Sequence, residues 1–444
     1  MKKILSICFC LLITTLGAAQ STHLEGDVNI SLNNRELNSD FWITNYAPEQ
    51  MTISFMLNSD IKIKAVTLNT GKIATEKTKT SCYDCHVYEV KLPRKLTLSD
   101  TIGIQTKGSF KSFKAGTNKK DYKGKIANNY GILRASEQAK WYPVLTSEED
   151  NLPSFARKHA YTYSLKVNCA DCKGIYVGAG VPQKSGSLFV AKRATKDIML
   201  IAGDISWTEG SNAIFINVAD EKMRGKLDGL FSSIAAYYEK LTQIEMPTKY
   251  VLAHLPSDNK RWGGFMTYPT IVSVRKSFGN RGLAAYLSHE VAHYLFGDVY
   301  QAESNLFWFY LESFAEYFSY KYLLEHEPDA MHSDYKRFKN SQAFIRLDQV
   351  NTFNDVSGSY RYLIGPFQLL ALEERIGEAK MLELIKTVYP KLATSKDGYK
   401  ALIDSLAEIG IAKETIDEVE EKLFKAFHIE EYQFVETLLR ADKK

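Results

Sequence analysis

A polar triplet inside an apolar, helix-patterned segment constrains this chain more than any other feature. His289, Glu290 and His293 lie in the run from 284 to 296, whose other members are mostly apolar or aromatic. A spacing of four residues puts both imidazoles on one face of a helix, one turn apart. Burying such groups costs free energy unless a partner offsets it, and two imidazoles can share a Zn²⁺ ion. The segment therefore predicts a buried helix that holds two ligands of a metal site.

A second apolar segment supplies a candidate third ligand. Eighteen residues separate His293 from Glu312, which lies in the helical pattern Leu306–Glu325 and would be costly to bury unpaired. Two histidines and one glutamate leave a fourth metal position open, as in catalytic rather than structural zinc sites. Glu290 is badly angled for a ligand and is expected to reach a water there as a general base. Glu316 is either a supporting residue or a surface residue, and the surface interpretation is preferred.

The stretch from His289 to Glu316 resembles the gluzincin peptidases, most closely the aminopeptidase N family of zinc metallopeptidases. That family carries H-E-x-x-H, eighteen residues and then a sequence like E-G-F-A, which here reads Glu312-Ser313-Phe314-Ala315. Its continuation H-x-x-F-G-[ND] is matched by His293 and by the run Phe296-Gly297-Asp298. The resemblance implies a zinc-dependent hydrolase of peptide bonds.

The same resemblance assigns roles to individual residues. One catalytic Zn²⁺ would be held by His289, His293 and Glu312, and Glu290 would be the general base. A family Y-x-x-G segment is matched by Tyr362-Leu363-Ile364-Gly365. Tyr362 would then donate a hydrogen bond to the developing oxyanion. Tyr360 competes for this role, and the register set by Gly365 favours Tyr362.

The sequence departs from the family at the expected substrate-binding strand. Family exopeptidases carry G-x-M-E-N there, and its Glu binds the free amino group of the substrate. The matching residues here are Gly264, Phe265, Met266 and Thr267, followed by Tyr268. Thr267 has no charge to pair with an ammonium group, which argues against strict aminopeptidase specificity and leaves endopeptidase or relaxed exopeptidase action. The strand backbone would still bind an extended peptide.

A catalytically weak relative that acts as a peptide-binding or scaffolding protein is the alternative function. The substitution at Thr267 favours it. The retention of Glu290 beside an open metal position opposes it, because a pure binding protein has no need for a base there.

The pattern along the chain predicts an α+β protein of two domains. Short alternating runs recur between residues 24 and 203, which is typical of an antiparallel β-sandwich. Helical periods follow, beginning with Lys222–Thr242. The expected domains are 20–203 and 204–444. The resemblance implies a saddle-like β domain, supported by Trp141-Tyr142-Pro143, and a thermolysin-like catalytic domain. The family's large C-terminal helical domain would be lacking, because only about seventy residues follow Gly377.

Two C-x-x-C pairs contain all the cysteines that follow the first nineteen residues, namely Cys82, Cys85, Cys169 and Cys172. The preferred interpretation is disulfides, which an exported protein permits. The alternative is a second, structural Zn²⁺ held by four thiolates. Haem attachment at Cys85-His86 is the least favoured, because the flanking sequence looks like β structure.

The N-terminus indicates export. Lys2 and Lys3 precede the apolar run Ile4–Leu16, and small residues lead to a cleavage position after Ala19. We therefore expect a signal peptide at residues 1–19 and a periplasmic or extracellular protein. Its net charge falls from +4 to +2 once the two lysines are removed, so no nucleic-acid partner is expected. No other stretch is predicted to span a membrane. The expected partner is a peptide substrate, and the sequence leaves the oligomeric state open.

Overall fold

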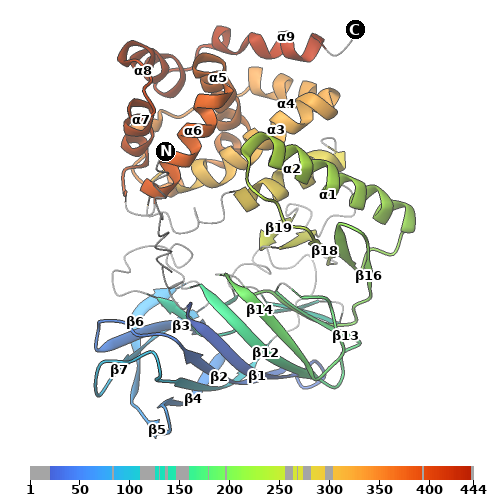
Figure 1. The fold of residues 1–444 in the computed structure, drawn as a ribbon, viewed down its shortest axis with the longest axis vertical. Coiled ribbons are helices and arrows are strands. Elements are labelled where there is room, and N and C mark those ends of the chain that lie inside the picture. Colours follow the sequence, from blue (N-terminus) through green and yellow to red (C-terminus); the bar gives the residue numbers. More distant parts are fainter. Residues whose placement is uncertain are drawn as a thin grey trace, which may run out of the picture.

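A β-sheet region precedes a mostly helical region in the computed structural model (Figure 1). The structure describes residues 21–441 except for 83–84, 111–125, 130, 136–138, 147–159, 179, 196–197, 256–263, 268, 274–281, 296–303 and 393–394. The predicted α+β class is confirmed. The predicted signal peptide at residues 1–19 lies outside the described residues, and the domain boundary at 203/204 stays a prediction.

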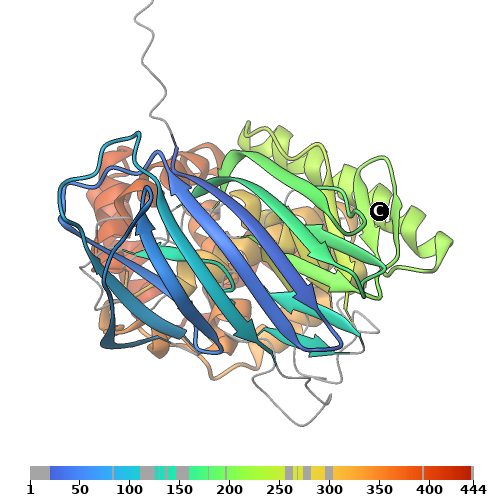
Figure 2. The same cartoon turned by 90° about the horizontal axis from the view of Figure 1, so that it is seen from below.

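The N-terminal region packs one large sheet against two smaller ones, and Figure 2 shows strands of the large sheet from below. The large sheet consists, in spatial order, of β14 (Ser187–Thr195), β12 (Tyr161–Cys169), β1 (His23–Ser31), β2 (Glu36–Thr44), β8 (Ile102–Ser109), β4 (Ile61–Leu68) and β5 (Gly71–Lys72). One small sheet consists of β11 (Val144–Thr146), β3 (Thr52–Asn58), β7 (Cys85–Lys91) and β6 (Thr75–Cys82). The other consists of β13 (Gly174–Val177), β15 (Leu200–Gly203), β10 (Ile132–Ala135) and β9 (Ala127–Asn129).

A single apolar core lies between these three sheets. In β1 every second residue is buried, including Leu24, Val28 and Ile30, and β2 alternates in the same way. This period of two turns one face of the large sheet toward the core. Trp141 lies in this core, fully buried, and its indole nitrogen donates to the backbone oxygen of Ile198 over 2.7 Å.

Two details of the β region differ from the sequence prediction. Strand β1 pairs in parallel with β12, so the sandwich is not purely antiparallel. Parallel pairing requires a long connection, and residues 32–160 supply it. The predicted β region includes β1 and β2 but the pattern does not mark them as separate runs, because their outward-facing positions carry residues such as Glu25, Asp27 and Asn38 that are depleted in strands.

A five-stranded sheet joins the β region to the helices. Its spatial order is β16 (Trp207–Glu209), β17 (Ala213–Ile216), β18 (Tyr250–His254), β20 (Thr270–Ser273) and β19 (Gly264–Thr267). The helix α1 (Glu221–Thr242) connects β17 to its parallel neighbour β18. Leu252 belongs to the core under the helices, whereas Val251 and Ala253 belong to a core shared with β10, β13 and β15. Burial on both faces explains why these strands are continuously apolar.

The remaining chain is helical. The α-helices are α2 (Gly282–Ala292), α3 (Phe314–His326), α4 (Pro328–Lys339), α5 (Gly365–Ile376), α6 (Glu378–Leu392), α7 (Gly398–Glu408), α8 (Lys413–Val419) and α9 (Phe434–Ala441). Short turns of π-helix are η3 (Phe309–Ser313), η6 (Tyr360–Ile364) and η7 (Glu420–Phe424). Short 3₁₀ turns are η4 (Leu347–Gln349), η5 (Phe353–Asp355) and η8 (Ile429–Tyr432). Among the described residues, no helix is both long and apolar enough to span a membrane.

Small residues bring α2 and α3 close together. Ser288 of α2 and Ser319 of α3 share a hydrogen bond of 2.8 Å between their hydroxyl oxygens, and both are fully buried. The Ser319 hydroxyl also donates to the backbone oxygen of Ala285 over 3.2 Å. Tyr238 of α1 donates to the backbone oxygen of Ser288 over 2.8 Å. Three helices are thus fixed to one another beside the two predicted histidine ligands.

Replacing Gly203 by alanine should destabilise the chain by about 2–4 kcal/mol. Gly203 has a φ of +131°, and an added Cβ would lie 2.1 Å from the backbone oxygen of Gly131. The free energy of unfolding is measured by urea titration. Gly225→Ala, in α1, is the matched control because no atom would lie within 4 Å of its Cβ. That variant should be stabilised by about 0.5–1 kcal/mol. Equal effects at the two positions would contradict the prediction.

Candidate metal centre

Helix α2 presents two imidazoles toward one point. It ends at Ala292, and residues 293–295 continue as a tighter 3₁₀ turn, which is common at helix ends. The rings of His289 and His293 have centroids 4.8 Å apart and planes at 86°. His293 is 7% exposed, and the His289 side chain is 12% exposed. The two side chains therefore lie side by side in a largely dry environment.

Glu312 completes a three-atom cluster. Its Oε2 lies 3.3 Å from Nε2 of His289 and 3.6 Å from Nε2 of His293. The three residues offer ligand atoms that all lie within 4.8 Å of one another and could hold a metal ion. Glu312 is 8% exposed and comes from η3, at the start of the second predicted helix. The structure therefore brings together the three predicted ligands from two separate elements.

The cluster passes a geometric test for a metal. Two ligands that each lie about 2.1 Å from a tetrahedral Zn²⁺ are about 3.4 Å apart, close to the two separations found here. The buried Oε2 of Glu312 has no well-formed hydrogen bond among the described residues. A carboxylate oxygen that faces two imidazole nitrogens without such bonds is a suitable donor set for a cation.

The protonation of these ligands also suits a cation. Burial is the main cause that lowers the pKa of His293 to about 4, so its imidazole is neutral near pH 7. Burial alone would raise the pKa of Glu312. The close His289 imidazole, and then the positive charges nearby, outweigh burial, so the net pKa is lowered and the carboxylate is ionised. A neutral imidazole and a carboxylate are the forms that bind metals.

Glu316 lies next to the ring nitrogen of His289 that does not face Glu312. Its Oε2 lies 2.6 Å from Nδ1 of His289, and the residue is only 1% exposed. The preferred surface interpretation of Glu316 is therefore wrong. A carboxylate this close to Nδ1 favours the tautomer with the proton on Nδ1, which leaves the Nε2 lone pair of the same ring free for a metal, and such partners fix the orientation of histidine ligands. The signal in the sequence was the helical spacing of four from Glu312, combined with the apolar residues around it.

Glu290 lies beside the cluster and is 6% exposed. Burial, and then the charge of Glu312, raise the pKa of Glu290 well above its ordinary value. A divalent cation on the neighbouring ligands would act in the opposite direction. A carboxyl group whose pKa is raised holds a proton more readily than an ordinary glutamate, which suits general acid–base chemistry.

The structure places Tyr362, and not Tyr360, next to the cluster. The Tyr362 ring lies 5.8 Å from the His289 ring, and 40% of the residue is exposed. Burial of its hydroxyl end raises the pKa of Tyr362 well above the ordinary value, and the negative charge of Glu312 adds to the effect. Tyr360 is fully buried and donates to the side-chain oxygen of Gln368. Tyr360 therefore fills the core, while Tyr362 faces the candidate metal site.

Gly365 permits the close crossing of the two segments that carry Glu312 and Tyr362. A Cβ at Gly365 would lie 2.3 Å from the Ser313 hydroxyl oxygen and 2.8 Å from the Ser313 Cβ. The same hydroxyl donates to the backbone oxygen of Arg361 over 2.9 Å. Both segments cross as π-helical turns, η3 and η6, and such turns are frequent at functional sites.

A contact that the sequence did not predict lies beside Tyr362. The guanidinium carbon of Arg361 lies 4.6 Å from the ring centroid of Trp308 and 5.9 Å from that of Tyr362. The lowering of the pKa of Glu312 comes first from His289 and then from the charge of His293, and the charge of Arg361 is the last and smallest cause. Trp308 and Arg361 are far apart in the sequence, so no local pattern could have indicated their contact.

The predicted substrate-binding residues form the backbone of β19, which pairs with β20 at the end of the five-stranded sheet. This strand contacts α2. A Cβ at Gly264 would lie 2.2 Å from the Tyr286 hydroxyl oxygen, so glycine is required for the close approach. The side chains of Phe265 and Thr267 lie outside what the structure describes, as do residues 268 and 296–298 of the sequence motifs.

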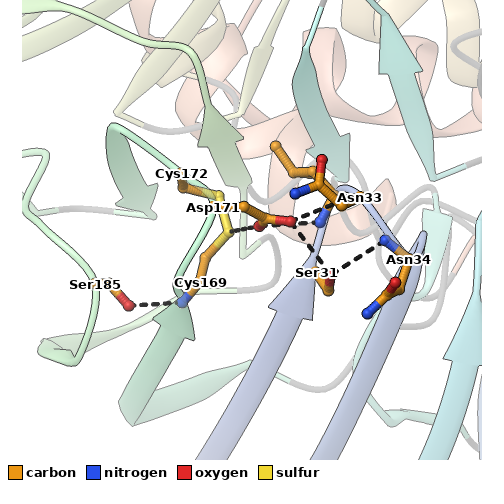
Figure 3. The surroundings of a disulfide bond; sticks show 8 residues. Ser31, Asn33, Asn34, Cys169, Asp171, Cys172 and Ser185 are labelled. Carbon is orange, nitrogen blue, oxygen red and sulfur yellow. Dashed lines mark hydrogen bonds between the residues drawn. A yellow bond between two sulfur atoms is a disulfide. The ribbon is translucent and has the colours of Figure 1, made fainter.

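Three of the four cysteines in the two pairs are found in disulfides. Cys169 and Cys172 are bonded to each other, and Cys85 is also disulfide-bonded. The side chain of Cys82 is outside the described part of the chain. Figure 3 shows Asp171, between the bonded pair, accepting hydrogen bonds from the turn after β1, including 2.8 Å from the Asn33 amide. The disulfide interpretation is thus observed for Cys169 and Cys172, and a second zinc is unsupported.

Comparisons with known proteins find structural likeness but no sequence match. No family model matches the chain, and no curated protein matches its sequence. A mutant M1 zinc metallopeptidase from Deinococcus radiodurans, bound to a Tyr-Ser-Ala substrate, aligns with a TM-score of 0.65 at 14% identity, over 92% of this chain and 95% of that chain. Leukotriene A4 hydrolase from Saccharomyces cerevisiae aligns with a TM-score of 0.60 at 14% identity, over 92% of this chain and 68% of that chain. The chain therefore has the fold of the two-domain M1 zinc metallopeptidases.

Removing the charge of Glu316 should weaken metal binding about 10- to 100-fold without abolishing it. In Glu316→Gln the amide no longer fixes His289 as well as a carboxylate does, although all three predicted ligands remain. Affinity is measured by competition between the protein and a zinc chelator. Glu325→Gln is the control, because Glu325 is exposed and lies on the same helix. An unchanged affinity in Glu316→Gln would rule out a supporting role.

Proposed function

We propose that this protein is an exported, zinc-dependent metallopeptidase similar to aminopeptidase N. The observation that carries the proposal is the convergence of His289, His293 and Glu312 at separations that suit a tetrahedral ion. The shared fold supports it, because the structural neighbours are zinc metallopeptidases and one holds a Tyr-Ser-Ala peptide. Export, to the periplasm or the extracellular space, rests on the predicted signal peptide at residues 1–19.

The three ligands leave one side of the ion open, which is the arrangement of catalytic zinc. When bound, Zn²⁺ supplies Lewis acidity toward a scissile carbonyl and lowers the pKa of water. Glu290 takes a proton from the attacking water and later passes it to the leaving amine. Its burial, at 6% exposure, excludes competing solvent from this proton transfer.

Tyr362 stabilises the charge that develops on the substrate. Its hydroxyl stays protonated at neutral pH, because burial and the nearby carboxylates raise its pKa. A protonated phenol can donate a hydrogen bond to the oxyanion of the tetrahedral transition state. Donors of this kind are effective because they are oriented before the reaction begins.

The substrates are peptides outside the cytoplasm. A peptide in extended form would pair with the backbone of β19, which is the last strand of its sheet. Thr267 supplies no negative charge for a free amino group, so we propose endopeptidase or relaxed exopeptidase action instead of strict aminopeptidase action. A peptide-binding protein without turnover is the competing function, and it would not require the base Glu290.

The replacement Glu290→Gln should leave zinc bound and lower peptide hydrolysis by about 10²- to 10⁴-fold. Glutamine has nearly the same shape but cannot accept the proton. Zinc content is measured by elemental analysis, and cleavage of a peptide library is followed by mass spectrometry. The exposed Glu325→Gln variant serves as the control and should cleave at the normal rate.

The same library separates the modes of cleavage if each peptide is present with a free and with an acetylated N-terminus. Both forms should be cleaved, because no charged amine anchor is present at position 267. Cleavage of the free form alone would mean that another group binds the amine. A zinc-loaded wild-type protein that cleaves no peptide would refute the proposed activity and favour the binding protein.

Tyr362→Phe should lower kcat by about 10²- to 10³-fold with little change in KM, because only the transition state uses the hydroxyl. Steady-state kinetics on one cleaved peptide measure both constants. Tyr360→Phe is the matched control, since it removes the same atom two residues away. It should destabilise the fold by about 1–3 kcal/mol, because Gln368 loses its partner, while kcat stays normal. A normal kcat in Tyr362→Phe together with a lowered kcat in Tyr360→Phe would instead assign the oxyanion hydrogen bond to Tyr360.

A further inference from the structure

A positive charge lies beside the candidate active site without a described counter-ion. The Arg361 guanidinium stacks on Trp308 at 4.6 Å and lies 5.9 Å from the ring of Tyr362. Trp308 directly precedes η3, which carries Glu312, and Tyr362 lies against His289. The cation is therefore held by aromatic rings on the two segments that also carry a metal ligand and the oxyanion donor.

Among the described residues, no side chain accepts a hydrogen bond from the guanidinium of Arg361, and no carboxylate forms an ion pair with it at 4.0 Å or less. Its Nε atom is buried and has no hydrogen-bond partner among the described residues. The residue as a whole is half-buried, so part of it is exposed to solvent next to Tyr362 in the sequence. A partly desolvated guanidinium with free donors is an effective receptor for a carboxylate, which it can bind through two hydrogen bonds.

The packing of Arg361 reduces the cost of binding an anion. Stacking on Trp308 restricts the side chain before any ligand arrives, so little conformational entropy is lost on binding. The backbone of Arg361 is fixed as well, because its oxygen accepts from the Ser313 hydroxyl over 2.9 Å. Both constraints hold the guanidinium at a constant position relative to the site.

We propose that Arg361 is a specificity-determining residue that binds a carboxylate of the peptide substrate close to the scissile bond. This inference rests on the proposed peptidase function. It also complements the neutral Thr267, since a neutral residue at the expected amine-binding position, together with a cation that has no ion pair among the described residues, favours the acidic parts of a peptide. The carboxylate is either the C-terminus of a short peptide or the side chain of Asp or Glu.

The distance limits which peptide residue can supply the carboxylate. The guanidinium is 5.9 Å from the Tyr362 ring, and that ring is 5.8 Å from the His289 ring. An extended peptide advances by about 3.3–3.6 Å per residue. The carboxylate that binds Arg361 therefore belongs to a residue within about three positions of the bond that is cleaved.

The test compares peptides that differ only in one charge. One series carries the C-terminus as a free acid or as an amide, and a second series carries Glu or Gln at each of three positions on either side of the cleaved bond. For the zinc-loaded full chain, kcat/KM should be about 10- to 100-fold higher for an acidic member of one series. The series that shows the preference identifies the source of the carboxylate.

Substitutions then assign the preference to Arg361. Arg361→Met keeps much of the side-chain length and should abolish the preference, while kcat/KM for the neutral peptides stays within about threefold. Arg361→Lys should retain part of the preference, because it keeps the charge but loses the planar, two-pronged contact. Arg193→Met is the matched control. That cation also lies over an aromatic ring, that of Tyr294, at 5.8 Å, and its removal should leave the preference unchanged.

Three results would overturn the inference while leaving the peptidase function intact. They are a wild-type enzyme indifferent to the charge, an equal loss on acidic and neutral peptides in Arg361→Met, and an equal effect of Arg193→Met. If no peptide at all is cleaved, the proposed activity fails. The inference is then judged by the binding of the same peptide pairs to zinc-loaded Glu290→Gln. Tighter binding of acidic members that depends on Arg361 supports it, and equal binding overturns it.

Discussion

The burial of ionisable side chains between α2 and α3 is the constraint on which the rest of the structure depends. His289, His293, Glu312 and Glu316 lie within hydrogen-bonding or metal-ligating distances in an otherwise apolar interface. Unpaired, they would cost several kcal/mol each. In the proposed site a shared cation would offset that cost, and the close approach of Glu316 to Nδ1 would orient His289 as a ligand.

The surrounding fold keeps this helix pair in place. The five-stranded sheet packs against the helices on one face and against the β region on the other, so it fixes the two regions relative to each other. A buried hydrogen bond between Tyr176 of β13 and Thr270 of β20 links the two regions directly. Among the described strands, the last one, β19, pairs on one side only, with β20, and it contacts α2. The same sheet thus supports the ligands and leaves a backbone edge beside them for an extended peptide.

The polar residues around the site fall into two groups, those proposed to carry out hydrolysis and those proposed to select the substrate. In the proposed mechanism, the metal ligands, Glu290 and Tyr362 supply the groups that hydrolysis of a peptide bond requires. Arg361 and the neutral Thr267 are proposed instead to select which charges on a substrate are attracted. Relatives with the same fold can therefore share a reaction and differ in substrate. A shared fold at 14% identity does not indicate which substrate is preferred.

The sequence by itself determined the elements and the donor types, because both follow from local patterns. Helical spacing placed His289 and His293 on one face, and apolar alternation indicated most strands of the β region. Only the tertiary structure decided which distant residues meet. Glu316 proved to be a buried partner of His289, Tyr362 rather than Tyr360 faced the site, and Arg361 met Trp308. These outcomes depend on helix crossings that close contacts such as Gly365 with Ser313 permit, and no local pattern encodes such crossings.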